Sequence, residues 1–97
     1  MAQPAVLRPE VVDEELVARG LHWVREDSAL VRGVRRADFA EALAVVNTVG
    51  LLAEAADHHP DIDIRWNAVT LRLSTHSAGG ITEKDLSLAA EIDAAVD

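Results

Sequence analysis

The feature that most constrains this chain is a long apolar stretch from Asp38 to about Ala56. Asp38 stands three residues before Glu41, a spacing typical of the capping box that opens a helix, so we expect one helix over 38–56. Its apolar residues form two stripes, one of Phe39, Leu43, Val46, Gly50 and Ala53 and the other of Ala42, Val45, Val49, Leu52 and Ala56. A helix that is apolar around most of its circumference must be buried on more than one side.

The rest of the chain is too small to cover both stripes. Its 97 residues make one domain, 1–97, and although 49% of them are hydrophobic, 17 are alanines, which bury little area. Aromatic residues make up 3% and cysteine is absent, so neither large rings nor disulfides add stability, and small domains of this kind often oligomerise. We therefore expect a sheet to cover one stripe and a second copy of the chain to cover the other.

The charge balance excludes several classes of partner. Nine Lys and Arg against 17 Asp and Glu give a net charge of −8, whereas nucleic-acid affinity depends on how many phosphates a protein neutralises. We expect no nucleic-acid partner and, for the same reason, no membrane partner. No run approaches the roughly 18 apolar residues of a membrane span, and the first residues lack a signal-peptide pattern, so a cytoplasmic protein is expected.

Hydrophobic periodicity, together with the positions of proline, glycine and helix-capping residues, predicts the remaining elements. Residues 1–9 contain prolines and are expected to form a loose arm, followed by a short helix over 11–20 that ends at a glycine. Two short runs of branched or aromatic residues, 21–25 and 30–35, predict a hairpin. A last helix is predicted from the cap formed by Thr82 and Asp85, with Leu88, Ala89, Ile92 and Val96 facing the core.

A second hairpin is predicted where apolar and polar residues alternate over 61–66 and 69–74. With Asn67-Ala68 as a two-residue loop, Trp66 pairs with Val69, Ile64 with Leu71 and Ile62 with Leu73. The same register places Asp63 opposite Arg72, and this pair of opposite charges supports it.

Extending that register brings histidines together. His59 falls opposite His76, 17 residues later, and Asp61 falls opposite Ser74. His58 is adjacent to His59, Asp57 precedes it, and Glu54 stands one helical turn earlier. Imidazoles exchange protons near neutral pH, so histidines with nearby carboxylates are typical of a general acid–base site.

Simpler interpretations stand beside this one. Glu54 is also a plausible solvated helix residue, and Asp85 a plausible partner in a helix cap. The hydroxyls of Ser74 and Thr75 end a strand, where ordinary hydrogen bonding is common. His22 lies away from the cluster and is interpreted as structural.

A metal site is the competing chemical interpretation, because imidazoles and carboxylates also bind zinc or iron. Adjacent residues on a strand point to opposite faces, so His58 and His59 do not naturally converge on one ion. The sequence contains no His-x-His, no His-Glu-x-x-His and no cysteine. We therefore expect no metal.

The spacing of the candidate residues is itself distinctive. Glu54 is followed after three residues by His58-His59-Pro60, and Trp66, His76 and Asp85 follow after five, nine and eight further residues. This pattern resembles the signature of the pterin-4a-carbinolamine dehydratases, also called 4a-hydroxytetrahydrobiopterin dehydratases. The resemblance spans nearly the whole chain.

The resemblance implies an α+β fold with a four-stranded antiparallel sheet and three helices on one face, in the order α-β-β-α-β-β-α. It implies homodimers or homotetramers, the latter assembled through the helix near 38–56. It also implies a reaction, the loss of water from a 4a-hydroxytetrahydropterin to give a quinonoid dihydropterin, with neither metal nor organic cofactor.

Roles follow from the resemblance position by position. His58 and His76 would donate and accept protons, and His59 would orient or bind the pterin. Glu54 and Asp85 would set the charge state of the histidines. The substrate contacts implied by the family are Asp57, His58, His59, Ser74, Thr75, His76 and Ser77.

The chain departs from the family pattern at a few positions. Ser77 stands where many members have glutamate, which removes a carboxylate near the pocket, and Ile62 and Ile64 replace aromatic residues. The alternative function is a non-catalytic dimerisation or assembly module, because family members also act as dimerisation cofactors of a transcription factor. A pure scaffold has no physical need of three imidazoles and two carboxylates at one hairpin end, which favours the enzyme.

Overall fold

The computed structural model describes residues 4–97, and its elements follow the predicted order. The helices are α1 (Pro9–Ala18), α2 (Phe39–Ala56) and α3 (Glu83–Val96). The strands are β1 (Val24–Glu26), β2 (Ala29–Arg35), β3 (Asp61–Arg65) and β4 (Ala68–Leu73). They pair antiparallel in one sheet of order β1-β2-β4-β3.

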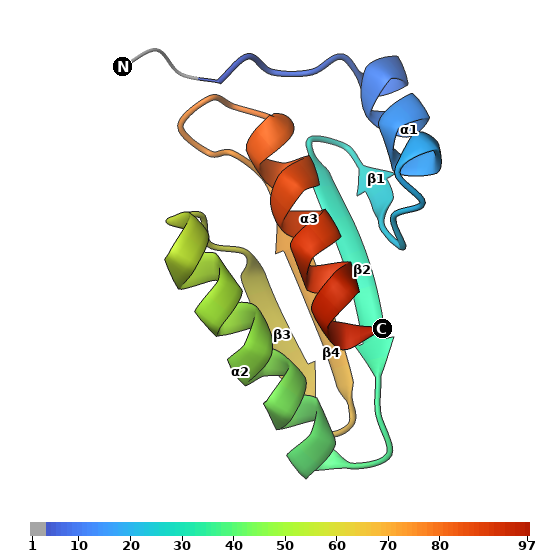
Figure 1. The fold of residues 1–97 in the computed structure, drawn as a ribbon, viewed down its shortest axis with the longest axis vertical. Coiled ribbons are helices and arrows are strands. Elements are labelled where there is room, and N and C mark those ends of the chain that lie inside the picture. Colours follow the sequence, from blue (N-terminus) through green and yellow to red (C-terminus); the bar gives the residue numbers. More distant parts are fainter. Residues whose placement is uncertain (1–3) are drawn as a thin grey trace.

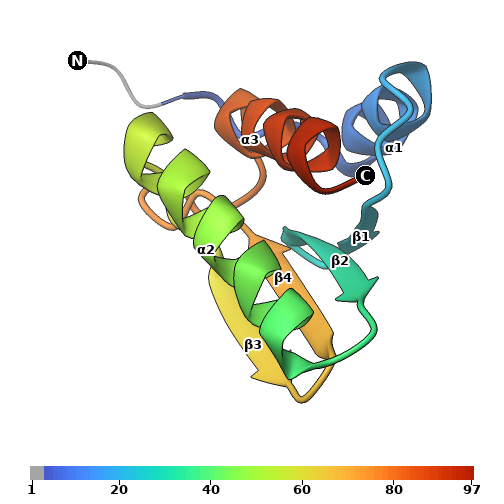
Figure 2. The same cartoon turned by 60° about the horizontal axis from the view of Figure 1, so that its bottom comes forward.

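The helices lie on one face of this sheet, as expected for the α+β class. α2 and α3 lie across it, whereas α1 lies at the β1 edge (Figures 1 and 2). Leu30, Leu71 and Leu73 of the sheet are fully buried in one cluster with side chains of the three helices. The opposite face carries exposed polar residues such as Thr70 and Arg72.

α2 begins and ends as its sequence dictates. The Asp38 side chain accepts a hydrogen bond from the backbone N–H of Glu41 at 2.9 Å, which confirms the predicted cap. At the other end Asp57 adopts the left-handed conformation, with φ 49°. The backbone N–H of His58 then donates to the Ala53 carbonyl, so the chain turns sharply where the histidine pair begins.

Only one side of α2 is buried by the rest of the chain. Ala42, Val45, Val49 and Ala53 are buried and face the core. On the remaining surface Phe39 is 47% exposed, Leu43 42% and Leu51 74%. We call these last three residues the outer stripe of α2, and nothing in residues 4–97 covers it.

By length and composition α2 is also apolar enough to cross a membrane. The sequence analysis did not predict this, because it considered only unbroken runs of apolar residues. It packs against β3, β4 and α3. The core helix of a small domain passes the same test of length and composition, so the test by itself is weak evidence of a membrane span.

The second hairpin forms, but its predicted register is wrong. The loop is Trp66-Asn67 rather than Asn67-Ala68, so Asp61 pairs with Arg72. Asp63 lies opposite Thr70 instead of Arg72, and its carboxylate pairs along the strand with Arg65. The predicted pairing of His59 with His76 does not exist as a strand pair.

The error has a physical cause. A tight two-residue hairpin loop needs positive φ at its first position, a conformation that asparagine tolerates well and tryptophan seldom adopts. Here Trp66 adopts it, with φ 49°. The observed register differs from the predicted one by two residues, so that Ile64, for example, pairs with Val69 instead of Leu71. A shift of two residues leaves every side chain on the same face of the sheet, and Ile64 still packs on the core.

The predicted loose arm, residues 1–9, is only partly described, because residues 1–3 lie outside the described part. Pro9 belongs to α1. The backbone N–H of Leu7 donates to the Ile81 carbonyl at 2.8 Å. Val6 lies so close to Gly80 that a Cβ added there would come within 2.8 Å of a Val6 methyl group. The arm from residue 4 onward is therefore docked on the loop before α3.

A nearly buried ion pair ties β2 to α3. The guanidinium of Arg32 binds the carboxylate of Asp93, and both side chains are 10% exposed. Asp93 also accepts hydrogen bonds from the Trp23 indole and from the backbone N–H of His22, each at 2.8 Å. Three parts of the chain, β2, α3 and the segment before β1, thus meet at one carboxylate.

We predict that Asp93→Ala lowers the free energy of unfolding by about 3–5 kcal/mol, because the buried Arg32 charge keeps only the more exposed Asp97 as a partner, and the Trp23 indole and the His22 N–H lose their acceptor. Urea denaturation followed by circular dichroism measures this change. Asp63→Ala is the matched control, since its pair with Arg65 is exposed and should contribute less than about 1 kcal/mol. Equal effects of the two substitutions would contradict the prediction.

Candidate active site

A cavity of about 280 Å³ lies where α2 and β4 end and α3 begins. Its walls are formed by Asp57, His58, His59, Ser74, Thr75, His76, Ser77 and Lys84. All seven residues expected to contact a substrate therefore line one cavity, and Lys84 joins them. The wrong hairpin register did not matter for this result, because the turn after α2 and the loop after β4 bring the two segments together.

The loop after β4 is held closed by its backbone. The N–H of Thr75 donates to the Gly80 carbonyl at 2.9 Å, and the N–H of Gly79 returns to the Thr75 carbonyl at 2.9 Å. Gly79 takes φ 83°, which favours glycine at this position. His76 and Ser77 therefore stand on a closed turn directly beside the end of the sheet.

His58 is held by a buried carboxylate. Its Nε2 lies 2.6 Å from Oδ1 of Asp85, whose side chain is fully buried. The other carboxylate oxygen accepts the Thr75 hydroxyl at 2.8 Å and the backbone N–H of Thr82 at 2.9 Å. Both oxygens of Asp85 therefore have hydrogen-bond partners. With Asp85 as the acceptor, the proton of the His58 ring lies on Nε2, and Nδ1 is the nitrogen left for a ligand.

A short relay of hydroxyls supports Asp85. Thr75 gives its only hydroxyl proton to Asp85, so the Thr82 hydroxyl, 2.8 Å away, must donate to Thr75. The Thr82 oxygen in turn accepts the backbone N–H of Lys84. Thr75 is almost completely buried, so it holds Asp85 in place instead of offering its hydroxyl to a substrate.

The second histidine–carboxylate pair is exposed. Nε2 of His59 lies 2.5 Å from Oε2 of Glu54, and both side chains are more than half exposed. Solvent and salt screen such a pair, so it restrains His59 much less than Asp85 restrains His58. His76 is exposed at the same cavity. The site thus combines one fixed imidazole with two accessible ones.

The structure confirms the simpler, structural interpretation of Asp85, which is the capping partner of Thr82, and the same side chain also contacts His58. The Ser74 hydroxyl donates to the Ser28 carbonyl at 2.8 Å, an ordinary structural bond. His22 lies outside the cavity and pairs with Asp97 at 2.7 Å, as expected of a structural residue.

One group within residues 4–97 has metal-like spacing, and the sequence did not single it out. His22, Asp93 and Asp97 place one ligand atom each within 4.8 Å of one another. Arg32 binds both carboxylates, and its hydrogen bond holds the pKa of Asp97 below the ordinary value. The guanidinium already binds both carboxylates and offsets one of their two negative charges. The sequence feature that could have predicted this cluster is the position of one aspartate, Asp93, on the apolar face of α3.

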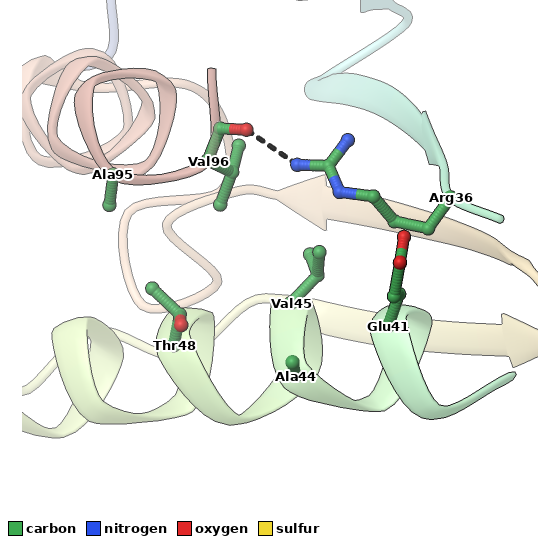
Figure 3. A pocket seen from close by; sticks show the side chains of 7 residues that line it. All are labelled: Arg36, Glu41, Ala44, Val45, Thr48, Ala95 and Val96. Carbon is green, nitrogen blue, oxygen red and sulfur yellow. Dashed lines mark hydrogen bonds between the residues drawn. The ribbon is translucent and has the colours of Figure 1, made fainter. Parts of the chain in front are cut away.

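Another cavity, of about 280 Å³, lies at the opposite end of α2, between its first turns and the last turn of α3. Figure 3 shows Arg36 at its edge, donating a hydrogen bond to the carbonyl of Val96. Glu41 accepts a bond from the backbone N–H of Ala37. These two hydrogen bonds satisfy the Val96 carbonyl at the end of α3 and the Ala37 N–H just before α2. None of the expected site residues lines this cavity.

Comparison with known proteins points to one family. A family profile described as pterin 4 alpha carbinolamine dehydratase matches residues 5–95. A protein of Mycobacterium sp. (strain KMS), named provisionally as a pterin-4-alpha-carbinolamine dehydratase, is 53% identical over 93 residues, which are 96% of this chain and 98% of that protein. A protein of Chloroflexus aurantiacus with the same name is 50% identical over 90 residues, 93% of this chain and 95% of its own.

Solved structures share the fold. The crystal structure of a transcriptional coactivator/pterin dehydratase from Brucella melitensis superposes with a TM-score of 0.86 at 33% identity, covering 95% of this chain and 99% of that one. A pterin dehydratase-like protein described as a RuBisCO assembly factor in the alpha-carboxysome gives a TM-score of 0.61 at 21% identity, over 76% and 86% of the two chains. The second likeness concerns the fold alone.

We predict that Asp85→Asn lowers the free energy of unfolding by about 1–3 kcal/mol, because an amide cannot accept all three donors that meet there. The His58 ring should also change its tautomer or orientation, which nitrogen-15 NMR of the imidazole reports. Glu54→Gln, at the exposed pair, should leave stability unchanged. A stable Asp85→Asn variant with an unaltered His58 spectrum would refute the role given to Asp85.

Proposed function

The chain belongs to the pterin-4-alpha-carbinolamine dehydratase family, and from that premise we propose that it removes water from a 4a-hydroxytetrahydropterin to give the quinonoid dihydropterin. This lyase reaction recycles the tetrahydropterin used in aromatic amino acid hydroxylation. The observation that carries the proposal is one cavity with three histidines, of which His58 is fixed by a buried carboxylate. Imidazoles give and take protons near neutral pH, so the reaction needs neither metal nor organic cofactor.

The reaction moves two protons. The C4a–O bond breaks while an acid donates a proton to the departing oxygen, which leaves as water, and a base takes the proton from N5. We assign these two tasks to His58, through its Nδ1, and to His76. One proton is given and one is taken, so the site returns to its starting state after a proton exchange with solvent.

The other residues bind or position in this proposal. His59, accessible and paired with Glu54, orients the pterin. Asp57, Ser74 and Ser77 line the cavity and offer hydrogen bonds to the polar edge of the ring. Asp85 is a positioning residue, and Thr75, whose hydroxyl bonds to it, acts through Asp85 rather than on the substrate.

A second candidate function is an assembly or coactivator module of the same fold. Its support is the outer stripe of α2, because exposed apolar surface of this kind often marks a protein interface. We propose that a second copy of the chain covers this stripe, in a homodimer or homotetramer that also carries the enzyme activity. We place the protein in the cytoplasm, with no nucleic-acid or membrane partner, in keeping with its net charge of −8.

We predict that the purified protein accelerates the decay of the ultraviolet signal of 4a-hydroxytetrahydropterin. His76→Ala should lose about 100-fold or more of this rate, the usual contribution of a positioned acid or base. His59→Ala should lose a comparable amount, because the pterin is no longer held in the reactive orientation. His22→Ala, outside the cavity, should keep the wild-type rate. Equal rates for the wild type and both cavity variants would reject the catalytic assignment.

We also predict that light scattering at micromolar concentration finds a dimer or tetramer, and that Leu43→Glu shifts it towards monomer by placing a charge in the interface. Val17→Glu is the matched control, because Val17 is 82% exposed on α1, outside the outer stripe. A wild-type protein that is monomeric throughout this concentration range would contradict the proposed assembly.

A further inference from the structure

Three buried side chains connect the start of α3 to the cavity that holds the histidines. Thr82 and Asp85 are fully buried, and Thr75 is 2% exposed. Thr75 lines the cavity, whereas Thr82 is not part of the cavity wall and lies behind Thr75, with its hydroxyl oxygen 2.8 Å from that of Thr75. Thr82 can therefore act on a bound ligand only through other side chains.

The hydrogen bonds between these side chains run in one direction, which is fixed at both ends. At one end the backbone N–H of Lys84, which can only donate, donates to the Thr82 hydroxyl oxygen at 3.2 Å. At the other end the Thr75 hydroxyl donates to Asp85 at 2.8 Å. The proton between the two threonines is therefore that of Thr82, and the chain of donors leads from the first turn of α3 to the carboxylate beside His58.

Burial makes each of these hydrogen bonds difficult to replace. Within residues 4–97, no buried side-chain nitrogen or oxygen lacks a hydrogen-bond partner. If the Thr82 hydroxyl were removed, the buried oxygen of Thr75 would lose its donor, and the unsatisfied group would carry a desolvation penalty. Linked hydrogen bonds also polarise one another where the dielectric is low, so the loss of one weakens the next. A change at Thr82 is thus transmitted to Asp85.

The backbone of Thr82 acts on the same carboxylate. Its N–H donates to Oδ2 of Asp85 at 2.9 Å, the oxygen that also accepts the Thr75 hydroxyl. The next residue, Glu83, accepts two hydrogen bonds of 2.7 Å from Arg19 at the end of α1. The first turn of α3 is therefore attached to a second helix, and Thr82 has a fixed position from which to hold the carboxylate.

We propose, on the premise of the dehydratase function above, that Thr82 is a positioning residue of the reaction. Its hydroxyl orients Thr75, and Thr75 in turn orients the carboxylate of Asp85. Asp85 then keeps the proton of the His58 ring on Nε2 and leaves Nδ1 for the substrate. The residue that caps α3 therefore also sets the tautomer of an imidazole that exchanges a proton in the reaction.

The test compares Thr82→Val, which keeps the shape of the side chain but loses the hydroxyl, with Thr82→Ser, which keeps the hydroxyl. We expect Thr82→Val to lower kcat about tenfold or more and to leave KM within about twofold, because Thr82 acts on the reacting group and not on the bound substrate. Thr82→Ser should rescue kcat to within about twofold of the wild type. Nitrogen-15 NMR of the imidazoles should show a changed His58 signal in Thr82→Val and a wild-type signal in Thr82→Ser.

Asp38→Ala is the matched control for a purely structural role. Asp38 caps α2 as Thr82 caps α3, but it stands at the opposite end of α2 from the cavity. Loss of either cap weakens the start of a helix, whereas only loss of the Thr82 hydroxyl should change kcat and the His58 signal. A wild-type kcat in Thr82→Val, or equal losses of kcat in Thr82→Val and Asp38→Ala, would overturn the inference. If Thr82→Val does not fold, Thr82→Gly replaces it under the same criteria, because glycine is well accepted at a helix cap.

Failure of this inference is distinct from failure of the proposed function. A wild-type protein that dehydrates 4a-hydroxytetrahydropterin, with an unchanged kcat in Thr82→Val, rejects only the role of Thr82. A wild-type protein that accelerates no dehydration rejects the enzyme, and the NMR measurement then decides the inference. In that case a changed His58 signal in Thr82→Val supports the chain of hydrogen bonds, and an unchanged signal overturns it.

Discussion

The carboxylate of Asp85 connects the fold to the chemistry. It closes the first turn of α3, holds the end of β4 through Thr75, and fixes the ring of His58. A fully buried charge is tolerated only when its oxygens are satisfied, and here every donor comes from a different element. The stability of the α3 start and the orientation of the imidazole therefore depend on one group.

Sequence reasoning succeeded where a local rule determines the structure. The caps at Asp38 and Thr82 follow from the spacing of a few residues, and the structure confirms them. The two stripes predicted for α2 were only partly right, because its buried face, Ala42, Val45, Val49 and Ala53, takes residues from both. The hairpin register failed because its evidence was a single charge pair, worth less than the turn geometry that places Trp66 at positive φ. The gathering of site residues survived because it depends on which segments meet and not on exact pairing.

Contacts between segments far apart in the chain were harder to predict from the sequence. The bond between Arg32 and Asp93 joins residues 61 apart, and only the position of an aspartate on an apolar helix face pointed to it. The cavities beside His58 are likewise formed by the docked arm, two helix ends and a loop, which no single sequence pattern describes.

The close approach of Val6 to Gly80 links parts of the molecule that have so far been treated separately. Any side chain at position 80 must displace Val6, because a Cβ there would stand 2.8 Å from its methyl group. Pro4, two residues earlier in the same arm, lines a cavity of about 300 Å³ that also has His58 in its wall, and Gly80 itself closes the loop that carries His76. One hydrogen atom in place of a methyl group thus lets the arm from residue 4 onward lie against the loop that carries His76, so that an early segment of the chain shapes a pocket built mainly from later ones.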